Sequence, residues 1–477
     1  MLHVPILRAG AAYRSLSTNE LRHVATGEPV ARVSQANGGL IARDLLQAGA
    51  GRRALQRLGA ADLVEICAAA AEAFMHDELP VDPLDGVRQS PEDYVSALSA
   101  TTGMPHTLVR GNMEKIRYVL AEMRTVIGGL TRGLDLAVLD RGFSRSGGRT
   151  VSYRAEAQVL GVVLPGNSPG VHSLWLPSIP LKVPLALKPG SQEPWTPMRV
   201  IQALLAAGCP GEACGFYPTD HAGATQILLR SCRALLFGDE ATVRPWRNDA
   251  RVQLHGPGWS KVLLGADAAS DWRRHLDLLV TSIAENGGRS CLNASGVWLP
   301  AHGREVAEAL AERLAAIEPL PLEHPGARVA AFSNPAVARG ISALIDRQLQ
   351  QPGAVDLTAR LRSGGRVVEV GGCTFLRPTL IWCEDPEHPL AQAEFLFPFA
   401  AVVEVPQAEL VSRMGSTLVA TAITSDEAFQ ATLLEARNID RLNLGPFPTS
   451  RVSWDQPHEG NLFEHLYRQR ALQAASA

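Results

Sequence analysis

The pattern of hydrophobic and polar residues divides the chain into a helical first part and two later blocks in which strands and helices alternate. Residues 17–130 carry mainly helical spacing of apolar positions, clearest over 62–75 and 112–126. Ser90, followed by a proline and two acidic residues, is typical of a capped helix start. The first part is therefore predicted to be mostly helical.

Residues 134–160 change character. An apolar run at 136–139, a turn at 146–148 and a run of strand-forming residues at 150–153 follow one another. Two such runs joined by a glycine-containing turn predict a β-hairpin. We expect this hairpin to stand apart from the helices before it.

From residue 159 to about 265 the chain repeats strand, loop and helix. Strands are predicted at 159–164, 183–188 and 234–237, and helices at 198–207 and 222–230. Strands separated by helices predict a parallel sheet with helices on both faces. Such sheets bind ligands beyond the carboxyl ends of their strands.

A second block of the same kind follows. Its predicted elements are helices at 271–285, 304–317 and 334–350 and strands at 367–370, 400–405, 418–423 and 442–444. The tail after residue 446 is polar and irregular, with a short basic helix predicted near 467–470. The expected fold class is therefore α/β, with two parallel-sheet domains and a hairpin arm.

Composition excludes several classes of protein. Of the 477 residues 46% are hydrophobic, which is enough to fill more than one core. The net charge of −3 gives no reason to expect nucleic acid or an anionic membrane as a partner. No apolar run reaches the roughly 18 residues that a membrane span needs. The seven cysteines are scattered without a CxxC pair, which argues against a disulfide framework or a cysteine metal site. A cytoplasmic enzyme without a metal is expected.

Cys291 ends the most informative stretch of the chain, which begins at Glu285 directly after a helical pattern. Asn286 and Gly287 can adopt the left-handed backbone that ends a helix. The following residues would then present one thiol beside the guanidinium of Arg289, and a nearby positive charge favours a nucleophilic thiolate. The alternative is that Cys291 is a small buried hydrophobic residue.

Four other segments bear on this thiol. They are Leu164-Pro165-Gly166-Asn167-Ser168-Pro169, Lys188-Pro189-Gly190-Ser191, His255-Gly256-Pro257-Gly258 and Glu394-Phe395-Leu396-Phe397-Pro398. With Cys291, they resemble the aldehyde dehydrogenase superfamily in order and spacing. The resemblance implies two Rossmann-like α/β domains and an oxidoreductase dependent on NAD or NADP. In that family a cysteine adds to an aldehyde, a hydride passes to a nicotinamide, and a thioester remains.

The resemblance assigns the reacting groups. It makes Cys291 the nucleophile and Asn167 the amide that, with a backbone N–H at the cysteine, holds the developing oxyanion. One such donor can contribute ~10²–10³ in rate. For Asn167 the alternative is a turn residue near Pro169.

The resemblance also assigns cofactor contacts. Lys188 matches the lysine at the adenosine ribose, and Glu394 matches the glutamate at the nicotinamide ribose, although Leu396 departs from the family's aromatic residue. Ser191 stands where NAD-preferring members carry a carboxylate, so NADP should be tolerated.

The remaining cofactor assignments fall on two loops. Leu164 and Pro165 are expected to border the cofactor, and Gly238 and Asp239 match a step near the pyrophosphate. Asp239 would repel phosphate there, so either the cofactor shifts or Asp239 only caps the helix.

The general base departs most from the family. Hydrolytic members carry a glutamate where this chain has His255, or Gln253 after a slip of two residues. The segment therefore resembles the branch that passes the acyl group to coenzyme A, or runs in reverse. A thiol with a pKa of about 8.5 needs less activation than water at about 15.7. His255 could act as a base or only fix the turn, and Glu285 could relay protons or only face solvent.

Three readings of the function are open: a dehydrogenase coupled to coenzyme A, a hydrolytic dehydrogenase that yields a carboxylic acid, and a non-catalytic protein that keeps the fold. The expected domains are residues 1–134 with 158–268 for the cofactor, 269–445 for catalysis, and 135–157 with 446–477 as an oligomerisation arm. Pairing of exposed strand edges predicts a homodimer or homotetramer.

Overall fold

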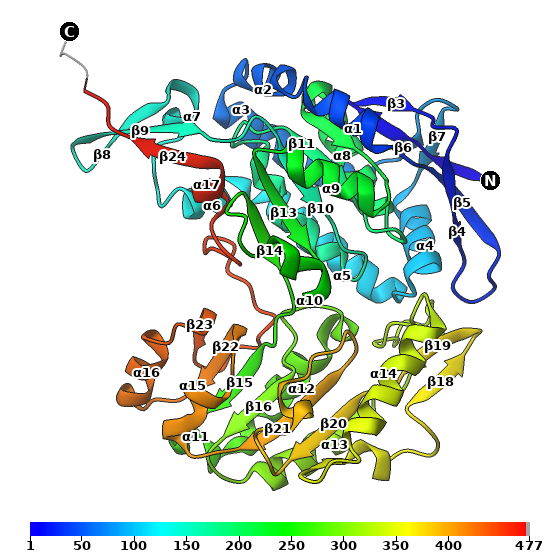
Figure 1. The fold of residues 1–477 in the computed structure, drawn as a ribbon, viewed down its shortest axis with the longest axis vertical. Coiled ribbons are helices and arrows are strands. Elements are labelled where there is room, and N and C mark those ends of the chain that lie inside the picture. Colours follow the sequence, from blue (N-terminus) through cyan, green and yellow to red (C-terminus); the bar gives the residue numbers. More distant parts are fainter. Residues whose placement is uncertain (474–477) are drawn as a thin grey trace.

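The computed structural model describes residues 1–473 and shows two lobes, each built on a seven-stranded sheet (Figure 1). The first sheet has the order β14-β13-β10-β11-β12-β2-β3. Its strands are β2 (Ile6–Arg8), β3 (Ala11–Tyr13), β10 (Leu160–Val163), β11 (Leu185–Lys188), β12 (Cys214–Phe216), β13 (Arg233–Phe237) and β14 (Val252–His255). The strands β10 to β14 are parallel, as the repeating pattern predicts.

Helices cover this sheet, and their apolar faces form its core. The main ones are α3 (Ala60–His76), α4 (Pro91–Thr102), α5 (His106–Ala121), α6 (Met123–Leu130), α8 (Trp195–Ala206) and α9 (His221–Arg230). The predicted start of α4 is confirmed, because the Ser90 hydroxyl accepts from the Asp93 amide at 3.1 Å and the Asp93 carboxylate accepts from the Ser90 amide at 3.1 Å. Bonding between these two residues fixes where α4 begins.

The prediction of helix from residue 17 onward is wrong at its start. Residues before the first helices, α1 (Gly38–Leu45) and α2 (Gly49–Gln56), form a small sheet of β1 (Leu2–Val4), β5 (Pro29–Ser34) and β4 (Thr18–Arg22). A further hairpin, β6 (Leu79–Asp82) with β7 (Val87–Gln89), interrupts the helical region. These strands depend on partners far along the chain or on a turn, which apolar spacing alone does not reveal.

The second sheet has the order β17-β20-β21-β16-β15-β22-β23. Its strands are β15 (Lys261–Leu264), β16 (Gly296–Leu299), β17 (Ala354–Asp356), β20 (Thr379–Cys383), β21 (Phe399–Glu404), β22 (Thr417–Ile423) and β23 (Ile439–Leu444). Alternate residues of one strand serve opposite faces: Val262 and Leu264 pack with α12 (Leu276–Ala284) and α13 (Gly303–Ala315), whereas Leu263 packs with α14 (Pro335–Gln348). The predicted strand at 367–370 lies outside this sheet, as β18 (Val367–Val370) paired with β19 (Cys373–Leu376).

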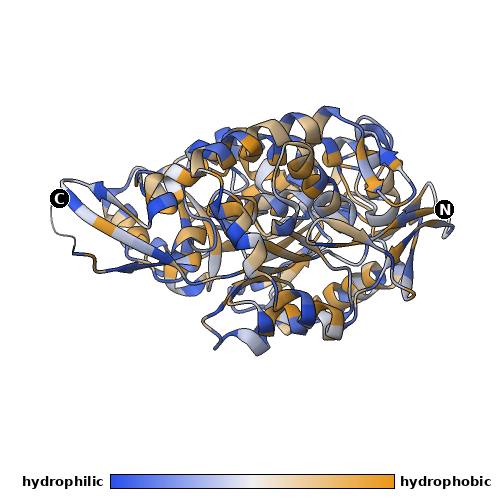
Figure 2. Cartoon of the chain, turned by 90° about the horizontal axis from the view of Figure 1, so that it is seen from above, coloured by the Kyte–Doolittle hydropathy of each residue, from blue (hydrophilic) through white to orange (hydrophobic). Residues whose placement is uncertain are grey.

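A three-stranded sheet projects from the first lobe (Figure 2). It contains β8 (Phe143–Ser146), β9 (Arg149–Ala155) and β24 (Tyr467–Arg470), with β9 in the centre. Two predictions are corrected here: residues 137–141 form the helix α7 (Ala137–Arg141), and the basic run at 467–470 is a strand. It is extended because it pairs with Ser152–Ala155 of β9.

The chain after β23 returns from the second lobe to the first and ends there in α17 (Leu462–Leu466) and β24 (Figure 1). The α17 side chains Leu462, Phe463 and Leu466 are buried in the core of the first lobe. This return holds residues 446–461 beside the junction of the lobes. Among the described residues, no helix is both long and apolar enough to cross a membrane.

Candidate active site

The loop that carries the thiol begins where α12 ends. Asn286, Gly287 and Gly288 have φ of 54°, 65° and 68°, which confirms the left-handed backbone predicted from the sequence. A Cβ on Gly288 would lie 2.3 Å from the carbonyl carbon of Phe397. Glycine is therefore required there both by the backbone angle and by the close approach of the segment that follows Glu394.

Hydrogen bonds fix Cys291 within this loop. The Ser260 hydroxyl donates to the Cys291 carbonyl at 2.7 Å, and the Asn293 amide donates to the Glu285 carbonyl at 2.9 Å. Gly258, from the predicted Gly-Pro-Gly turn, packs so closely that a Cβ there would lie 2.0 Å from the Cys291 oxygen. The Gly-Pro-Gly turn thus packs directly against the loop that carries Cys291 and supports it.

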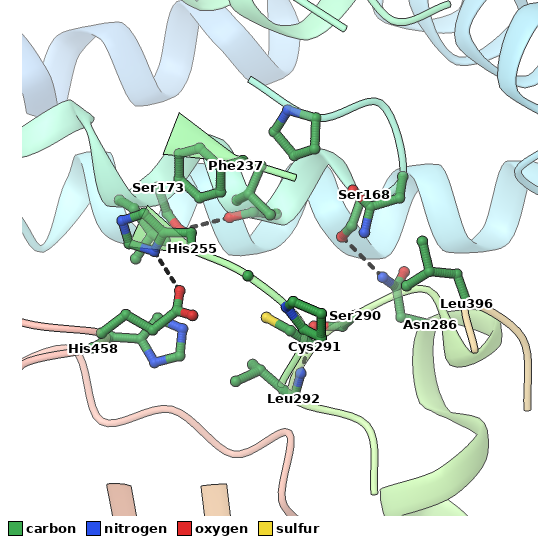
Figure 3. Close-up of a pocket in the computed structure, with 18 of the residues that line it drawn as sticks. Ser168, Ser173, Phe237, His255, Asn286, Ser290, Cys291, Leu292, Leu396 and His458 are labelled. Carbon is green, nitrogen blue, oxygen red and sulfur yellow. Dashed lines mark hydrogen bonds and ion pairs between the residues drawn. The ribbon is translucent and has the colours of Figure 1, made fainter. Parts of the chain in front are cut away.

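The loop that contains Asn167 bonds to the same region from the first lobe. The Asn167 side-chain amide donates to the Arg289 carbonyl at 2.8 Å. The Asn286 amide donates to the Ser168 hydroxyl at 3.0 Å and accepts from Asn112 of α5 at 2.7 Å (Figure 3). These buried hydrogen bonds connect the two lobes next to the thiol and fix the position of the two loops relative to each other.

A cavity of about 680 Å³ lies at this junction. Seven of the predicted site residues line it: Pro165, Asn167, Gly238, Asp239, His255, Cys291 and Glu394. Three do not. The side chain of Leu164 lies in the core of the first lobe, so only its backbone is available to a cofactor, and its assignment stays a prediction.

Lys188 and Ser191 lie away from the cavity, near the carboxyl end of β11. Ser191 is exposed, and burial lowers the pKa of Lys188. Within residues 1–473, the Lys188 ammonium has no hydrogen bond or ion pair to another side chain or carbonyl. A partly buried cation without a partner is suited to a polar ligand that arrives from solution.

Asp239 caps the short helix α10 (Glu240–Val243). Its carboxylate accepts from the amide of Thr242 at 2.9 Å and from the hydroxyl at 2.6 Å, and these bonds hold the pKa of Asp239 below its usual value. The sequence left two roles open for Asp239, and the structure shows the helix-capping role.

Glu394 is held by two backbone amides, those of Gly258 at 3.1 Å and of Trp259. Burial raises the pKa of Glu394 to about 7, although both amide bonds act in the opposite direction. Leu396 lines the cavity two residues further on. The carboxylate is therefore positioned by the same turn that supports Cys291.

His255 lies on the ring of Phe237, with the ring centroids 4.2 Å apart and the planes 12° apart. Its Nδ1 contacts a carboxylate oxygen of Glu459, a residue that none of the sequence motifs includes. Gln253 binds the Glu459 backbone carbonyl. The sequence signal for Glu459 is the run Pro457-His458-Glu459-Gly460, which places an imidazole and a carboxylate side by side in a tail predicted to be irregular.

The Cys291 sulfur faces this side of the cavity (Figure 3). Donor atoms of Cys291, His458 and Glu459 lie within 4.8 Å of one another. These atom types could also ligate a metal ion, and the sequence-based expectation of no metal stays a prediction.

The charges around the thiol keep it protonated at rest. Burial, then the negative charges of Glu459 and Glu394, raise the pKa of Cys291 well above its usual value. Burial lowers the pKa of His458 to about 4, so this imidazole is neutral. Burial alone would raise the pKa of Glu459, but the charge and hydrogen bond of His255 outweigh it and lower that pKa.

Arg289 does not serve the thiol. Its guanidinium contacts the Ala331 carbonyl and stacks on the Phe332 ring at 4.8 Å, outside the cavity lining. Burial lowers its pKa to about 10. The expected role in activating the cysteine is therefore wrong, because the left-handed turn directs this side chain into the core.

The side chains of His172, Trp175 and Glu285 also lie outside the cavity lining. His172 binds the Glu193 carboxylate at 3.0 Å and accepts from the Trp175 indole at 3.2 Å in the core of the first lobe. Glu285 contacts the Ser450 hydroxyl and forms an ion pair with Lys115 at 3.5 Å. His172 and Trp175 therefore pack in the core, and Glu285 is a partly exposed link to the C-terminal segment.

Comparison with known proteins agrees with this geometry. The model of the aldehyde dehydrogenase family matches residues 15–427. No curated protein matches the chain significantly by sequence.

Solved structures share the fold over nearly the whole chain. The structure of 3,6-anhydro-L-galactose dehydrogenase in complex with NADP is 13% identical, with a TM-score of 0.77 over 98% of this chain and 99% of that one. An indole-3-acetaldehyde dehydrogenase with NAD⁺ is 16% identical, with a TM-score of 0.78 over 98% and 96%. The aldehyde dehydrogenase KauB from Pseudomonas aeruginosa is 17% identical, with a TM-score of 0.78 over 99% and 96%. Because the family model covers most of its length, the chain belongs to the aldehyde dehydrogenase family.

Proposed function

We propose that the protein oxidises an aldehyde with NAD or NADP, using Cys291 as the nucleophile. The observation that carries this proposal is the junction itself: a free thiol and the Asn167 amide, from different lobes, line one cavity. The thiol lies on a loop fixed by three left-handed residues and several buried hydrogen bonds. A thiol needed only for packing would not need that support.

Asn167 can stabilise the charge that develops when the thiolate adds to the carbonyl carbon. One of its amide hydrogens is used by the Arg289 carbonyl, which fixes the direction of the group. The second hydrogen remains for the oxyanion. Donors positioned before the reaction require no reorganisation as the charge forms.

The cofactor residues fit a nicotinamide dinucleotide. The buried Glu394 carboxylate can accept from a ribose hydroxyl, and the Lys188 ammonium has no partner of its own within residues 1–473. When bound, this cofactor supplies the hydride acceptor that converts the thiohemiacetal on Cys291 to a thioester. Because Ser191 adds no negative charge, a 2′-phosphate is tolerated and NADP can replace NAD.

Two acyl acceptors are candidates for releasing the product. Coenzyme A, in either direction of the reaction, is favoured by a histidine at position 255 where the family's hydrolytic members have a glutamate. Water is favoured by the carboxylate of Glu459 beside the thiol. A non-catalytic protein is the third reading, and the organised junction around Cys291 argues against it.

We also propose the domain roles predicted from the sequence. Residues 1–134 and 158–268 would bind the cofactor, and 269–445 would carry the nucleophile. Residues 135–157 and 446–477 would pair with another copy of the chain in a homodimer or homotetramer. The projecting sheet of β8, β9 and β24 supports this assembly, since no other strand of the described residues pairs with its two outer edges.

The test is the formation of reduced cofactor with a panel of aldehydes, using NAD or NADP, with and without coenzyme A. Turnover by the wild-type protein that disappears in Cys291→Ala supports the proposal. A panel in which no aldehyde yields reduced cofactor contradicts it. A strict requirement for coenzyme A would identify the acyl acceptor.

A further inference from the structure

The C-terminal segment brings a carboxylate to the thiol at the place where the family motif lacks one. Glu459 lies between β23 and α17, more than 160 residues after Cys291. Its side chain is only 10% exposed, and one of its oxygens lies within 4.8 Å of the Cys291 sulfur. A general base can act through one water molecule, so a buried carboxylate this close to the sulfur is within reach of a water that attacks a thioester there.

We propose that Glu459 is the general base that activates water to cleave the thioester on Cys291, and that His255 is the residue that positions it. This inference rests on the proposed aldehyde oxidation, and it selects water as the acyl acceptor.

The contacts of His255 suit a positioning residue. Its Nδ1 is occupied by the Glu459 carboxylate, its other ring nitrogen lies 3.4 Å from the Gln253 amide, and its ring is stacked on Phe237. Both ring nitrogens thus face polar neighbours rather than the thiol. The carboxylate is the group that faces the reacting atoms.

The balance of the step is simple. A water oxygen adds to the thioester carbon while one of its protons passes to the Glu459 carboxylate. The carbon–sulfur bond then breaks, the carboxylic acid leaves, and the Cys291 sulfur keeps the electron pair. The proton on Glu459 is afterwards released to solvent, which restores the base.

The ionisation of Glu459 supports this role. His255 lowers its pKa, so the group is a carboxylate at neutral pH. The titratable groups that face it are His255 of β14, Cys291, Glu394, Asp440 of β23 and the adjacent His458. Of these, His458 is neutral because of burial, and its Nδ1 has no hydrogen-bond partner within residues 1–473.

The experiment compares Glu459→Gln with the wild-type protein in rapid-mixing assays with an aldehyde, NAD(P) and no coenzyme A. We expect Glu459→Gln to keep an initial burst of about one reduced cofactor per subunit, because oxidation precedes hydrolysis. Its steady-state kcat should fall by roughly 10²–10⁴. An acyl group should accumulate on Cys291 in the intact mass, and hydroxylamine, which attacks without a base, should restore turnover.

Two further variants control for structure. Glu464→Gln removes a carboxylate of the same segment that pairs with Arg132 at the surface, so it should leave both phases unchanged. His255→Gln should lower the steady-state rate less than Glu459→Gln does. In its pH–rate profile the acid limb should move to higher pH, because the pKa of Glu459 would rise without the imidazole. A merely structural role of His255 would not move that limb.

The proposal is overturned if Glu459→Gln turns over at the wild-type rate, or if it loses the burst together with turnover. It is also overturned if the wild-type protein releases product only when coenzyme A is present. Failure of the underlying function is distinguishable, because then the wild-type protein itself would give no burst with any aldehyde.

Discussion

At the scale of residues, the reactivity of Cys291 depends on charges contributed from far along the chain. Burial and two carboxylates raise the pKa of its thiol. The same arrangement that disfavours a resting thiolate places a base beside the later thioester. The resting thiol is thereby protected from unproductive alkylation and oxidation, which attack the thiolate form.

Replacing Glu459 by glutamine should change two rates in opposite directions. In Glu459→Gln, a negative charge near the sulfur is lost, so the pKa of Cys291 falls and more thiolate exists at neutral pH. Iodoacetamide should therefore label Cys291 faster than in the wild-type protein, although turnover is slower. Labelling rates measured by peptide mass spectrometry across pH test this, and a slower or unchanged rate would contradict the assigned charge.

Gly288 gives a second prediction at this scale. Gly288→Ala would place a Cβ at a φ of 68° and 2.3 Å from the backbone of Phe397, so we expect a loss of more than about 1 kcal/mol in the free energy of unfolding. Gly128→Ala in α6 is the matched control. It has no atom within 4 Å of the added group, and it should be neutral or slightly stabilising. Equal stability of both variants in urea unfolding would refute the packing argument.

At the scale of elements, parallel strands and their helices were predictable because each carries its own apolar pattern. Strands β10, β11 and β13 and helices α8, α9 and α13 lie close to their predicted ranges. The exceptions are elements defined by a distant partner. Strand β24 is an example, because its basic residues resemble a helix until they pair with β9.

The site residues also divide into those that local sequence predicts and those that depend on distant parts of the chain. Cys291, Asn167 and Glu394 were identified from local motifs, and the structure brings them to one cavity. Glu459 could not be placed from the sequence, because its position depends on the path of the C-terminal segment across the junction. Arg289 was misplaced because proximity in sequence to Cys291 does not determine the direction of a side chain after a left-handed turn.

Helix α17 anchors the segment that carries Glu459. Phe463 is buried and stacks on Tyr467 with ring centroids 5.1 Å apart. Phe463→Ala should therefore reduce the free energy of unfolding by about 3–5 kcal/mol and also slow steady-state turnover, since Glu459 would be less well held. Thermal unfolding measured together with burst kinetics tests both parts. A stability loss with unchanged deacylation would show that α17 does not position the base.

At the scale of the whole molecule, both lobes and the returning tail are needed to complete the cavity. The first lobe supplies Asn167 and His255, the second supplies Cys291 and Glu394, and the tail supplies Glu459. Buried hydrogen bonds between Asn112, Asn286 and Ser168 join the lobes at this point. Relative movement of the lobes would therefore change the position of the Cys291 thiol in the cavity.

The projecting sheet predicts the assembly. Within residues 1–473, strand β8 pairs only with β9, and it exposes Phe143, so we expect a second copy of the chain to cover this sheet. Light scattering should give at least twice the mass of one chain. Replacing Phe143 by lysine should shift the equilibrium toward monomers, and a monomeric wild-type protein would contradict the arm assignment.

The central claim is that an acyl group forms on Cys291 during aldehyde oxidation. The most direct measurement is peptide mass spectrometry of the wild-type protein quenched in acid during turnover with an aldehyde and NAD(P). We expect an adduct of the acyl mass on the peptide that contains Cys291, formed only when oxidised cofactor is present. Reduced cofactor formed without that adduct in Glu459→Gln, or an adduct on another cysteine, would contradict it.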